Sequence, residues 1–341
     1  MLCGADVKGP VRKTMKVLFI GGTGIISSAC SRLSVERGID LYLLNRGTTL
    51  RPIPAGAKIL KGDIRNDSSA KQAIGDLKFD AVVDWVAFTP EHIEADLKLF
   101  RDRTNQFVFI SSASAYQTPP INLPVTESTP LDNPYWEYSR AKIACEERLM
   151  SAYREEKFPM TIVRPSHTYD CTSLPMHGGY TIVDRMRKGK KVIVHGDGSS
   201  LWVLTHHADF AKGFVGLLGN SRAIGEAFQI TSDELLTWDQ IFEIVAAAAG
   251  TIAKIVHVTS DFIAKFDPEW GAGLLGDKSH SMIFDNSKIK RTVPGFSATI
   301  PFSQGARQIM AWLDANPSWK TVDETLNATI DSIITKYESI V

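Results

Sequence analysis

The chain has 341 residues, more than one typical domain, so we expect a two-lobed unit or two domains that share an interface. Its 38 basic residues equal its 38 acidic residues, which argues against broad electrostatic binding of nucleic acid or anionic membrane and favours small-molecule chemistry. No apolar run approaches the roughly 20 residues that span a bilayer, and no signal peptide opens the chain, so we expect a cytoplasmic protein with no membrane partner.

Strand-like and helix-like segments alternate through the first half of the chain, which is typical of a parallel sheet covered by helices. The predicted order is strand 16–20, helix 28–37, strand 40–44, strand 59–60, helix 68–75, strand 81–86, helix 92–100, strand 107–110, helix 138–155 and strand 160–164. We therefore predict an α/β fold, namely a Rossmann-type doubly wound parallel sheet with a smaller C-terminal α/β substrate lobe.

A glycine cluster, Gly21-Gly22-Thr23-Gly24, separates the first strand from the first helix. Glycines permit a tight turn there and let backbone N–H groups approach a pyrophosphate at the helix N-terminus. We expect Gly21, Gly24, Ile25 and Ile26 to bind the cofactor, although Ser27 stands where such turns usually have Gly or Ala. Strand, glycine turn, helix and second strand together predict a nucleotide-binding domain.

The end of the second strand usually decides between NAD and NADP, because an acidic residue there holds the ribose 2′-hydroxyl and repels a 2′-phosphate. This chain has Asn45 and Arg46, which carry no repelling charge and offer a guanidinium to a phosphate. The predicted cofactor is NAD or NADP, with NADP favoured; the alternative is that Arg46 is a solvated or adenine-stacking residue. Four further residues are expected to bind the cofactor after the third and fourth strands: Asp63, Ile64, Val86 and Ala87.

The alternation breaks after Arg164, where prolines and glycines indicate irregular structure. Further strands are predicted at 192–195 and 227–230, and helices at 209–218 and 238–249. Because the chain crosses between lobes more than once, residues 15–170 and 200–235 are assigned to the NAD(P)-binding domain. Residues 171–199 and 236–341 are assigned to the substrate-binding lobe. Residues 1–14 are expected to be a disordered extension.

Tyr138 and Lys142 are four residues apart at the start of a predicted helix and therefore lie on one face of it. A tyrosine becomes an acid or base near neutral pH only if nearby positive charge stabilises its phenolate, as Lys142 and an oxidised nicotinamide would. A tyrosine and a lysine at this spacing also occur by chance in unrelated sequences, but here the pair follows a half of the chain that is predicted to bind a nucleotide. Ser111 and Ser112 come just past a strand, at the sheet edge where such folds place their sites.

In this combination the sequence resembles the extended short-chain dehydrogenase/reductase family, especially its nucleotide-sugar epimerase/dehydratase branch. The resemblance runs from about Met15 to Ala249. Its motifs are the glycine turn, Gly62-Asp63, Ser111 to Tyr116, Val125-Thr126-Glu127, Tyr138 to Lys142, Arg164-Pro165, and Gly196-Asp197-Gly198 followed by Asp209. The resemblance implies that Ser112 hydrogen-bonds the reacting substrate oxygen, that Tyr138 is the acid/base, and that Lys142 holds the nicotinamide ribose and lowers the tyrosine pKa. It also implies a homodimer through two long helices, one of them 138–155.

Two departures from the family pattern concern the catalytic region. Ala113 and Ser114 stand where family 4,6-dehydratases carry an Asp-Glu pair that supplies the acid and base for water elimination. This disfavours a standard 4,6-dehydratase and agrees with epimerases, which have small residues there. The fourth strand ends in Asp84-Trp85-Val86-Ala87, whereas the family usually has a His before two small residues, so the pocket beside the nicotinamide is altered.

A third departure concerns the substrate. After Gly196-Asp197-Gly198 the family often has an arginine that grips the substrate diphosphate, but this chain continues with Ser199-Ser200-Leu201-Trp202. Either another group such as Arg185, Arg187 or Lys191 holds the phosphates, or the substrate is not a nucleotide diphosphate sugar.

Four residues are candidates for binding substrate: Phe88, Ser114, His167 and Trp202. His167 stands near where relatives often have an asparagine beside the substrate, and Trp202 can stack on a base or sugar, with a buried packing role as its alternative. His206 and His207 are adjacent and cannot both face one side of a regular element, and no further ligand has suitable spacing, so no metal site is predicted. The four cysteines lie far apart and are expected to be reduced thiols.

The leading hypothesis is an enzyme that acts on a sugar or nucleotide sugar by moving a hydride to the nicotinamide while Tyr138 takes the hydroxyl proton. Hydride return then completes an epimerisation or a redox-neutral dehydration. The first alternative is a net NADP-dependent reductase or dehydrogenase of a sugar, nucleoside or other ketone. The second is an RNA-binding relative, because Asn45-Arg46-Gly47 also resembles the plastid stem-loop RNA-binding branch; zero net charge and the complete set of Ser112, Tyr138 and Lys142 argue against it.

Overall fold

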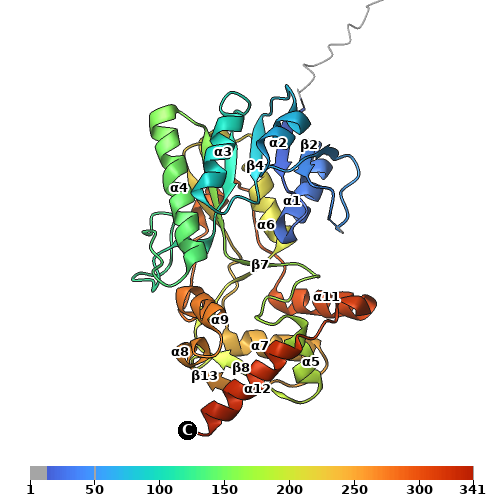
Figure 1. Cartoon of the computed structure of the whole chain (residues 1–341), viewed down its shortest axis with the longest axis vertical. Coiled ribbons are helices and arrows are strands. Elements are labelled where there is room, and N and C mark those ends of the chain that lie inside the picture. Colours follow the sequence, from blue (N-terminus) through green and yellow to red (C-terminus); the bar gives the residue numbers. More distant parts are fainter. Residues whose placement is uncertain (1–13, 50, 341) are drawn as a thin grey trace, which may run out of the picture.

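The computed structural model describes residues 14–49 and 51–340. The extension predicted for residues 1–14 therefore lies outside the described residues, except for Thr14. The chain forms a large sheet domain and a smaller lobe that lies against one end of it (Figure 1). Among the helices that the structure describes, none is both long enough and apolar enough to cross a bilayer.

A sheet of seven strands forms the centre of the large domain, in the order β11-β6-β5-β4-β1-β2-β3, with every neighbouring pair parallel. The strands are β1 (Lys16–Ile20), β2 (Asp40–Asn45), β3 (Lys58–Lys61), β4 (Ala81–Asp84), β5 (Phe107–Ile110), β6 (Met160–Pro165) and β11 (Ala227–Ile230). The direction of strand order reverses between β1 and β4, which is the position where doubly wound sheets bind their ligands. The predicted α/β fold with a Rossmann-type parallel sheet is confirmed.

Helices cover both faces of this sheet. One face carries α1 (Ile25–Glu36), α6 (His207–Val215) and α10 (Ser287–Thr292), and the other carries α2 (Asp67–Ile74), α3 (Pro90–Phe100) and α4 (Glu137–Glu156). Because β1, β4 and β5 are buried on both sides, they read as continuous apolar runs in the sequence. Ile289, Val293 and Phe296, which the sequence assigns to the substrate-binding lobe, pack against the first face.

Several elements differ from the predicted bounds by one to three residues, and two of these differences have local causes. Helix α1 begins at Ile25 rather than Ser28, because the Ser27 hydroxyl accepts the Gly24 N–H at 2.7 Å and caps the first turn. Strand β4 ends at Asp84 rather than Val86, because Asp84 Oδ1 accepts the N–H groups of Val86 (2.5 Å) and Ala87 (2.8 Å) and turns the chain. Ser27 thus fixes the start of helix α1, and Asp84 fixes the end of strand β4.

The smaller lobe combines three short strand pairs with helices. β7 (His167–Tyr169) pairs with β10 (Leu204–His206), β8 (Lys191–His195) with β13 (Lys254–Val258), and β9 (Leu201–Trp202) with β12 (Leu236–Thr237). The helices are α5 (Tyr180–Arg187), α7 (Trp238–Ala248), α8 (Ser260–Ala264), α9 (Pro268–Gly273), α11 (Phe302–Ala315) and α12 (Glu324–Glu338). A π-helical turn, Leu274–Lys278, follows α9 directly, and π-helical turns occur often at functional sites.

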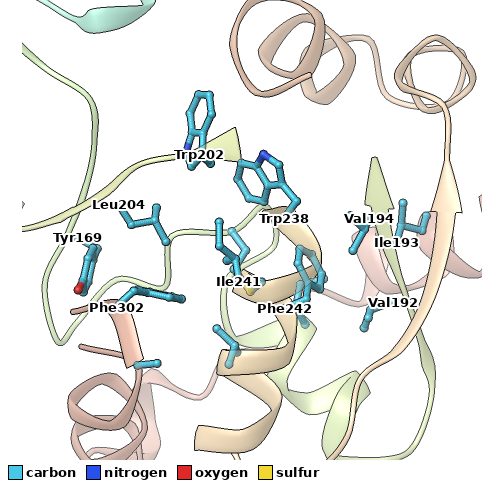
Figure 2. Close-up of a cluster of buried hydrophobic side chains, with 14 of the residues drawn as sticks. Tyr169, Val192, Ile193, Val194, Trp202, Leu204, Trp238, Ile241, Phe242 and Phe302 are labelled. Carbon is cyan, nitrogen blue, oxygen red and sulfur yellow. The ribbon is translucent and has the colours of Figure 1, made fainter. Parts of the chain in front are cut away.

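The core of the smaller lobe is rich in aromatic side chains. Figure 2 shows Trp202 and Trp238 side by side, with Ile241 and Phe242 continuing along α7 toward β8. The two indole rings are 5.5 Å apart between centroids. Helix α12 covers this core from outside with Ile330 and Ile333, which are fully buried. The lobe therefore has a hydrophobic core of its own beside the large domain.

Candidate active site

The glycine turn lies tightly against β2. Gly21 and Gly22 have φ angles of +98° and +90°, in the region that favours glycine, and the Gly21 N–H donates to Leu44 O at 2.9 Å. A Cβ added to Gly22 would lie 2.7 Å from Leu43 Cδ2. The turn can therefore approach β2 this closely only because Gly22 has no side chain.

A cavity of about 420 Å³ opens at the ends of β1 to β4, beside the glycine turn. Six of the predicted cofactor residues line it, and these are Gly21, Asn45, Arg46, Asp63, Ile64 and Val86. The other five, Gly24, Ile25, Ile26, Ala87 and Lys142, are not part of its wall. Phe88, predicted to bind substrate, lines this cavity instead, together with Thr23, Arg65 and His92, which the sequence analysis missed.

The polar groups of this cavity fit a dinucleotide. Asn45 Oδ1 accepts the Gly47 N–H at 3.0 Å, and its buried Nδ2 has no partner among the described residues. Arg46 lies exposed at the rim. A free amide donor with a guanidinium beside it suits ribose hydroxyls and an attached phosphate, and the bare glycine turn suits a pyrophosphate. Asn45 and Arg46 would therefore hold the ribose end of NAD or NADP.

Two buried carboxyl groups support the loop that closes the cavity. Asp84 is fully buried at the end of β4, and Asp96 on α3 is fully buried with both carboxyl oxygens unpaired among the described residues. Burial, followed by the Asp84 carboxylate, holds the pKa of Asp96 well above its usual range. Arg65 lies 3.7 Å from Asp84 Oδ2 and donates to Val86 O at 2.7 Å. Asp84 and Arg65 thus hold the loop that follows β4.

Lys142 is buried on α4 with 1% of its surface exposed. Its Nζ donates to Ala87 O at 2.7 Å and to Ile110 O at 2.8 Å, and so joins the ends of β4 and β5. The ammonium also lies over the rings of Phe88 (4.6 Å) and Tyr138 (5.7 Å). Burial lowers the pKa of Lys142 to about 8. The lysine is thus next to Tyr138, as the four-residue spacing predicts.

A row of three hydroxyl groups lies beside Tyr138. Ser112 Oγ is 2.8 Å from Ser114 Oγ, and the Ser139 hydroxyl donates to Ser114 Oγ, also at 2.8 Å. Ser114, predicted to contact substrate, is buried behind Ser112 and orients it. Ser139 was missed, although its position directly after Tyr138 in the helix was a usable signal.

The pKa of Tyr138 is raised above its usual value, mainly by burial, while the Ser112 hydroxyl lowers it and the Asp277 carboxylate raises it. This direction is opposite to the lowered tyrosine pKa that the family resemblance implies. The reason is geometric, because the Lys142 ammonium directs hydrogen bonds to two backbone carbonyls and lies 5.7 Å from the centroid of the tyrosine ring. Further positive charge is needed before Tyr138 ionises near neutral pH.

The π-helical turn of the smaller lobe packs against the segment that precedes Tyr138. Asn133 Nδ2 donates to Gly276 O at 2.6 Å, and a Cβ on Gly276 would lie 2.8 Å from Trp136 Cβ. Lys278 Nζ lies 5.3 Å from the Trp136 ring centroid, and the rings of Trp136 and Tyr138 are 5.0 Å apart. The two lobes therefore meet at Tyr138.

A second cavity, of about 450 Å³, begins at Trp136 and extends into the smaller lobe. Its wall includes His167, as predicted for a substrate residue, whereas Trp202 is buried outside it and donates from Nε1 to His167 Nδ1 at 3.1 Å. Burial lowers the pKa of His167 to about 3 and that of His195 to about 4, so both rings are neutral at pH 7. The remaining wall is mostly apolar and aromatic: Leu174, Met176, Ile182, Ile193, Trp238, Phe242, Trp270, Leu274 and Ile330.

The three cations suggested as substitutes for the diphosphate arginine are engaged elsewhere. Arg185 is buried and bonds Lys191 O (2.9 Å), Asn327 Oδ1 (2.5 Å) and Asp331 (2.6 Å). Arg187 contacts Asp314 on α11, and Lys191 contacts Glu338 on α12. None of the three lines the second cavity, so their contacts give no support to the suggestion that one of them holds substrate phosphates. Their charges instead attach α11 and α12 to the lobe.

The adjacent histidines have structural partners. His206 Nε2 lies 3.0 Å from Gln308 Oε1, and His207 Nδ1 lies 3.1 Å from Ile25 O. Within residues 14–49 and 51–340, no cluster of three His, Cys, Asp or Glu side chains has the arrangement of a metal site. The two histidines therefore serve to join α6 to α11 and to α1.

Known proteins match this chain along most of its length. The family model described as "NAD dependent epimerase/dehydratase family" matches residues 17–231. A chloroplast stem-loop binding protein of 41 kDa from Arabidopsis thaliana is 28% identical over 261 residues, 71% of this chain and 65% of that protein. The 2′-dehydrokanamycin reductase of Streptomyces kanamyceticus is 24% identical over 297 residues, 86% of this chain and 83% of that protein. The chain thus spans just under two thirds of the first relative and more of the second.

Solved structures share the fold over nearly the whole chain. An epimerase from Methanothermobacter thermautotrophicus superposes with a TM-score of 0.74 at 17% identity, covering 90% of this chain and 94% of that one. The UDP-glucose 4-epimerase of Bifidobacterium longum, solved with NAD+ and UDP, has a TM-score of 0.69 at 18% identity, covering 89% and 99%. At these identities the likeness establishes the fold.

Proposed function

The chain belongs to the NAD dependent epimerase/dehydratase family, and on that premise we propose that it transfers a hydride between a sugar-type hydroxyl carbon and NAD(P), with Tyr138 as the acid/base. The observation that carries the proposal is that Ser112 and Lys142 both lie beside Tyr138. The rings next to Tyr138, Phe88 and Trp136, line the first and the second cavity. The cavity beside the glycine turn is called the nucleotide cavity below. Lys142, on the same helix as Tyr138, donates to Ala87 O in the loop beside this cavity, and Trp136, just before the helix, lines the second cavity.

Each side chain has a role that its contacts support. Ser112, held by Ser114 and Ser139, hydrogen-bonds the reacting oxygen of the substrate. The phenolic oxygen of Tyr138 takes the hydroxyl proton during oxidation and returns it during reduction. Lys142 holds the nicotinamide ribose and adds positive charge beside the tyrosine. The bound nicotinamide supplies the hydride acceptor and, when oxidised, a further positive charge that favours the phenolate.

Hydride return within one catalytic cycle, giving an epimerase, is the form of the reaction that we place first. Ala113 and Ser114 offer no acid/base pair for water elimination, in agreement with this choice. We further propose NADP as the preferred cofactor, because Arg46 at the cavity rim can pair with a 2′-phosphate and Asn45 adds no negative charge.

Replacing Tyr138 tests the proposal. Tyr138→Phe should lower turnover about a hundredfold or more while cofactor affinity stays unchanged, since positioned acid/base catalysis contributes that much. Tyr135→Phe is the matched control, because Tyr135 lies exposed on the same segment and its hydroxyl has no proposed role. Turnover and the dissociation constant for NADPH are measured for both variants. Near-normal turnover in Tyr138→Phe contradicts the proposal.

A net reductase is the second candidate. It is favoured by the similarity to 2′-dehydrokanamycin reductase over most of both chains and by the lack of an arginine around the second cavity. The nucleotide released on denaturing the purified protein separates the two cycles. Stoichiometric cofactor supports internal hydride return, and an empty protein that binds NADPH reversibly supports the reductase. A protein that binds neither nucleotide, and binds stem-loop RNA with steep salt dependence, contradicts both.

A further inference from the structure

We infer that the second cavity takes a phosphate-free hydroxylated ring compound that carries an amino group, and not a nucleotide diphosphate sugar. This inference rests on the proposed function, because it assigns the substrate of the same site. Three features of the described residues carry it: the charges around the cavity, the aromatic walls, and the side chains of the adjoining Gly196-Asp197-Gly198 loop.

The charge around the cavity is unfavourable for a diphosphate. Its wall holds one ammonium group, Lys278, and two carboxylates, Asp267 and Glu269. Lys278 is already paired with Asp277 at 3.2 Å. A diphosphate would bring at least two further negative charges toward two carboxylates without meeting an arginine, whereas an ammonium group would meet opposite charge.

The neighbouring hollow offers no substitute cation. A depression of about 390 Å³ adjoins the cavity through His195 and contains the loop after which the family often has its diphosphate arginine. Its polar side chains are mainly serines: Ser199, Ser200, Ser279 and Ser281. It has no lysine or arginine in its wall. Hydroxyl groups of this kind suit the hydroxyls of a sugar ring and do not neutralise phosphate.

The aromatic walls suit a ring with an attached ammonium group. Trp238 and Trp270 both line the cavity, and the rings of Trp270 and His177 are stacked 4.4 Å apart at an interplanar angle of 10°. Asp267 Oδ2 lies 3.9 Å from His177 Nε2. The same side chain caps the N-terminus of α9, the helix that carries Trp270. Tryptophan faces beside carboxylates bind organic cations by combined cation–π and ionic attraction.

Two neutral histidines offer one hydrogen-bond donor and one hydrogen-bond acceptor to a molecule in the cavity. His167 Nδ1 accepts a hydrogen bond from Trp202, so the proton of the neutral ring is on Nε2, which is a donor. His195 Nε2 lies 2.8 Å from Lys278 O and donates to it, so its Nδ1 is an acceptor. One donor and one acceptor on an apolar wall match the hydroxyl groups of an uncharged ring.

Binding to the NADP-loaded full-length protein tests the inference, by calorimetry with three probes: kanamycin, fully N-acetylated kanamycin and UDP-glucose. Kanamycin should bind at least tenfold more tightly than its acetylated form, and UDP-glucose should not compete with it. Glu269→Gln should weaken kanamycin binding several-fold and leave the acetylated form unaffected. Glu243→Gln, at an exposed position on α7 outside the cavity wall, is the matched control and should change neither. Asp267→Asn, which retains a capping side chain, should repeat the effect of Glu269→Gln.

Three results overturn the inference: UDP-glucose binding as tightly as kanamycin, kanamycin affinity unchanged in both acidic-residue variants, or no kanamycin binding at millimolar concentration. Failure of the proposed function has a different signature. A protein that binds neither NADH nor NADPH, or that retains turnover as Tyr138→Phe, refutes the hydride-transfer mechanism. A protein that passes both of those tests and prefers UDP-glucose refutes only the substrate class.

Discussion

Tyr138 lies between two cavities that are built in different ways, because the neighbouring ring of Phe88 lines one and that of Trp136 lines the other. The nucleotide cavity is lined by residues between Ile20 and His92, taken from the ends of four neighbouring strands and the loops that follow them. The second cavity is lined by residues between Trp136 and Ile330, from strands, helices and the π-helical turn of the smaller lobe. In the first, backbone geometry and glycines determine the shape. In the second, large side chains from distant segments determine both the shape and the charge.

The difference matches two tasks: binding a dinucleotide, which many proteins do in the same way, and recognising one particular substrate. A dinucleotide can be recognised through N–H groups at a helix N-terminus, which any sequence with the right glycines can present. Under the proposed function, the second cavity would recognise its substrate through individual side chains, which can vary while the architecture of a fold is kept. The following predictions test whether the cations of each region have the role that the structure gives them.

Arg185→Met should produce the largest effect, a loss of about 2–3 kcal/mol in the free energy of unfolding, because it removes a buried guanidinium that pairs with the carbonyls of Lys191 and Asn327. The half-exposed Asp331 contributes less, since water can solvate it. The Michaelis constant should stay unchanged. Urea unfolding and steady-state kinetics are the measurements, with Arg187→Met as the surface control. An increased Michaelis constant without loss of stability would instead mean that Arg185 contacts substrate.

Arg46→Ala should weaken NADPH binding about tenfold and leave NADH binding unchanged, because only the 2′-phosphate pairs with the guanidinium. Fluorescence titration with each reduced cofactor gives the two dissociation constants. Arg37→Ala, at an exposed position just after α1, is the control for a general change in charge. Equal weakening of both cofactors would show that Arg46 contacts the adenine and not a phosphate.

The smallest expected effect is a pH dependence of cofactor binding. The pKa of Lys142 is lowered to about 8, so its ammonium form predominates below that pH and is lost above it. The dissociation constant for NADPH should therefore be flat from pH 6.5 to pH 7.5 and rise by up to about tenfold toward pH 9. Lys142→Met should bind weakly with no such rise. A wild-type profile that is flat to pH 9 would show that Lys142 does not hold the cofactor through its charge.

Much of the nucleotide-binding half could be predicted because its signals are short. About 20 residues contain the strand Lys16–Ile20, the glycines after it and the helix that follows. Each of these can be predicted from the periodicity or the turn residues of its own segment. The proximity of Tyr138 and Lys142 follows from a spacing of four on one helix. The element ends at Ile25 and Asp84 were missed because side-chain caps decided them. Assembly into a homodimer through α4 and a cytoplasmic location stay predictions.

The sequence by itself determined the fold class, the glycine turn and the proximity of Tyr138 and Lys142, because these depend on contacts between near neighbours along the chain. Only the tertiary structure decided that Arg185 serves α12, through Asp331, which lies 146 positions away. Only the tertiary structure placed Asp267, Glu269 and Trp270 around one cavity with His167. Such contacts join segments that are far apart in sequence, and their partners follow from how the whole chain packs and not from any local pattern.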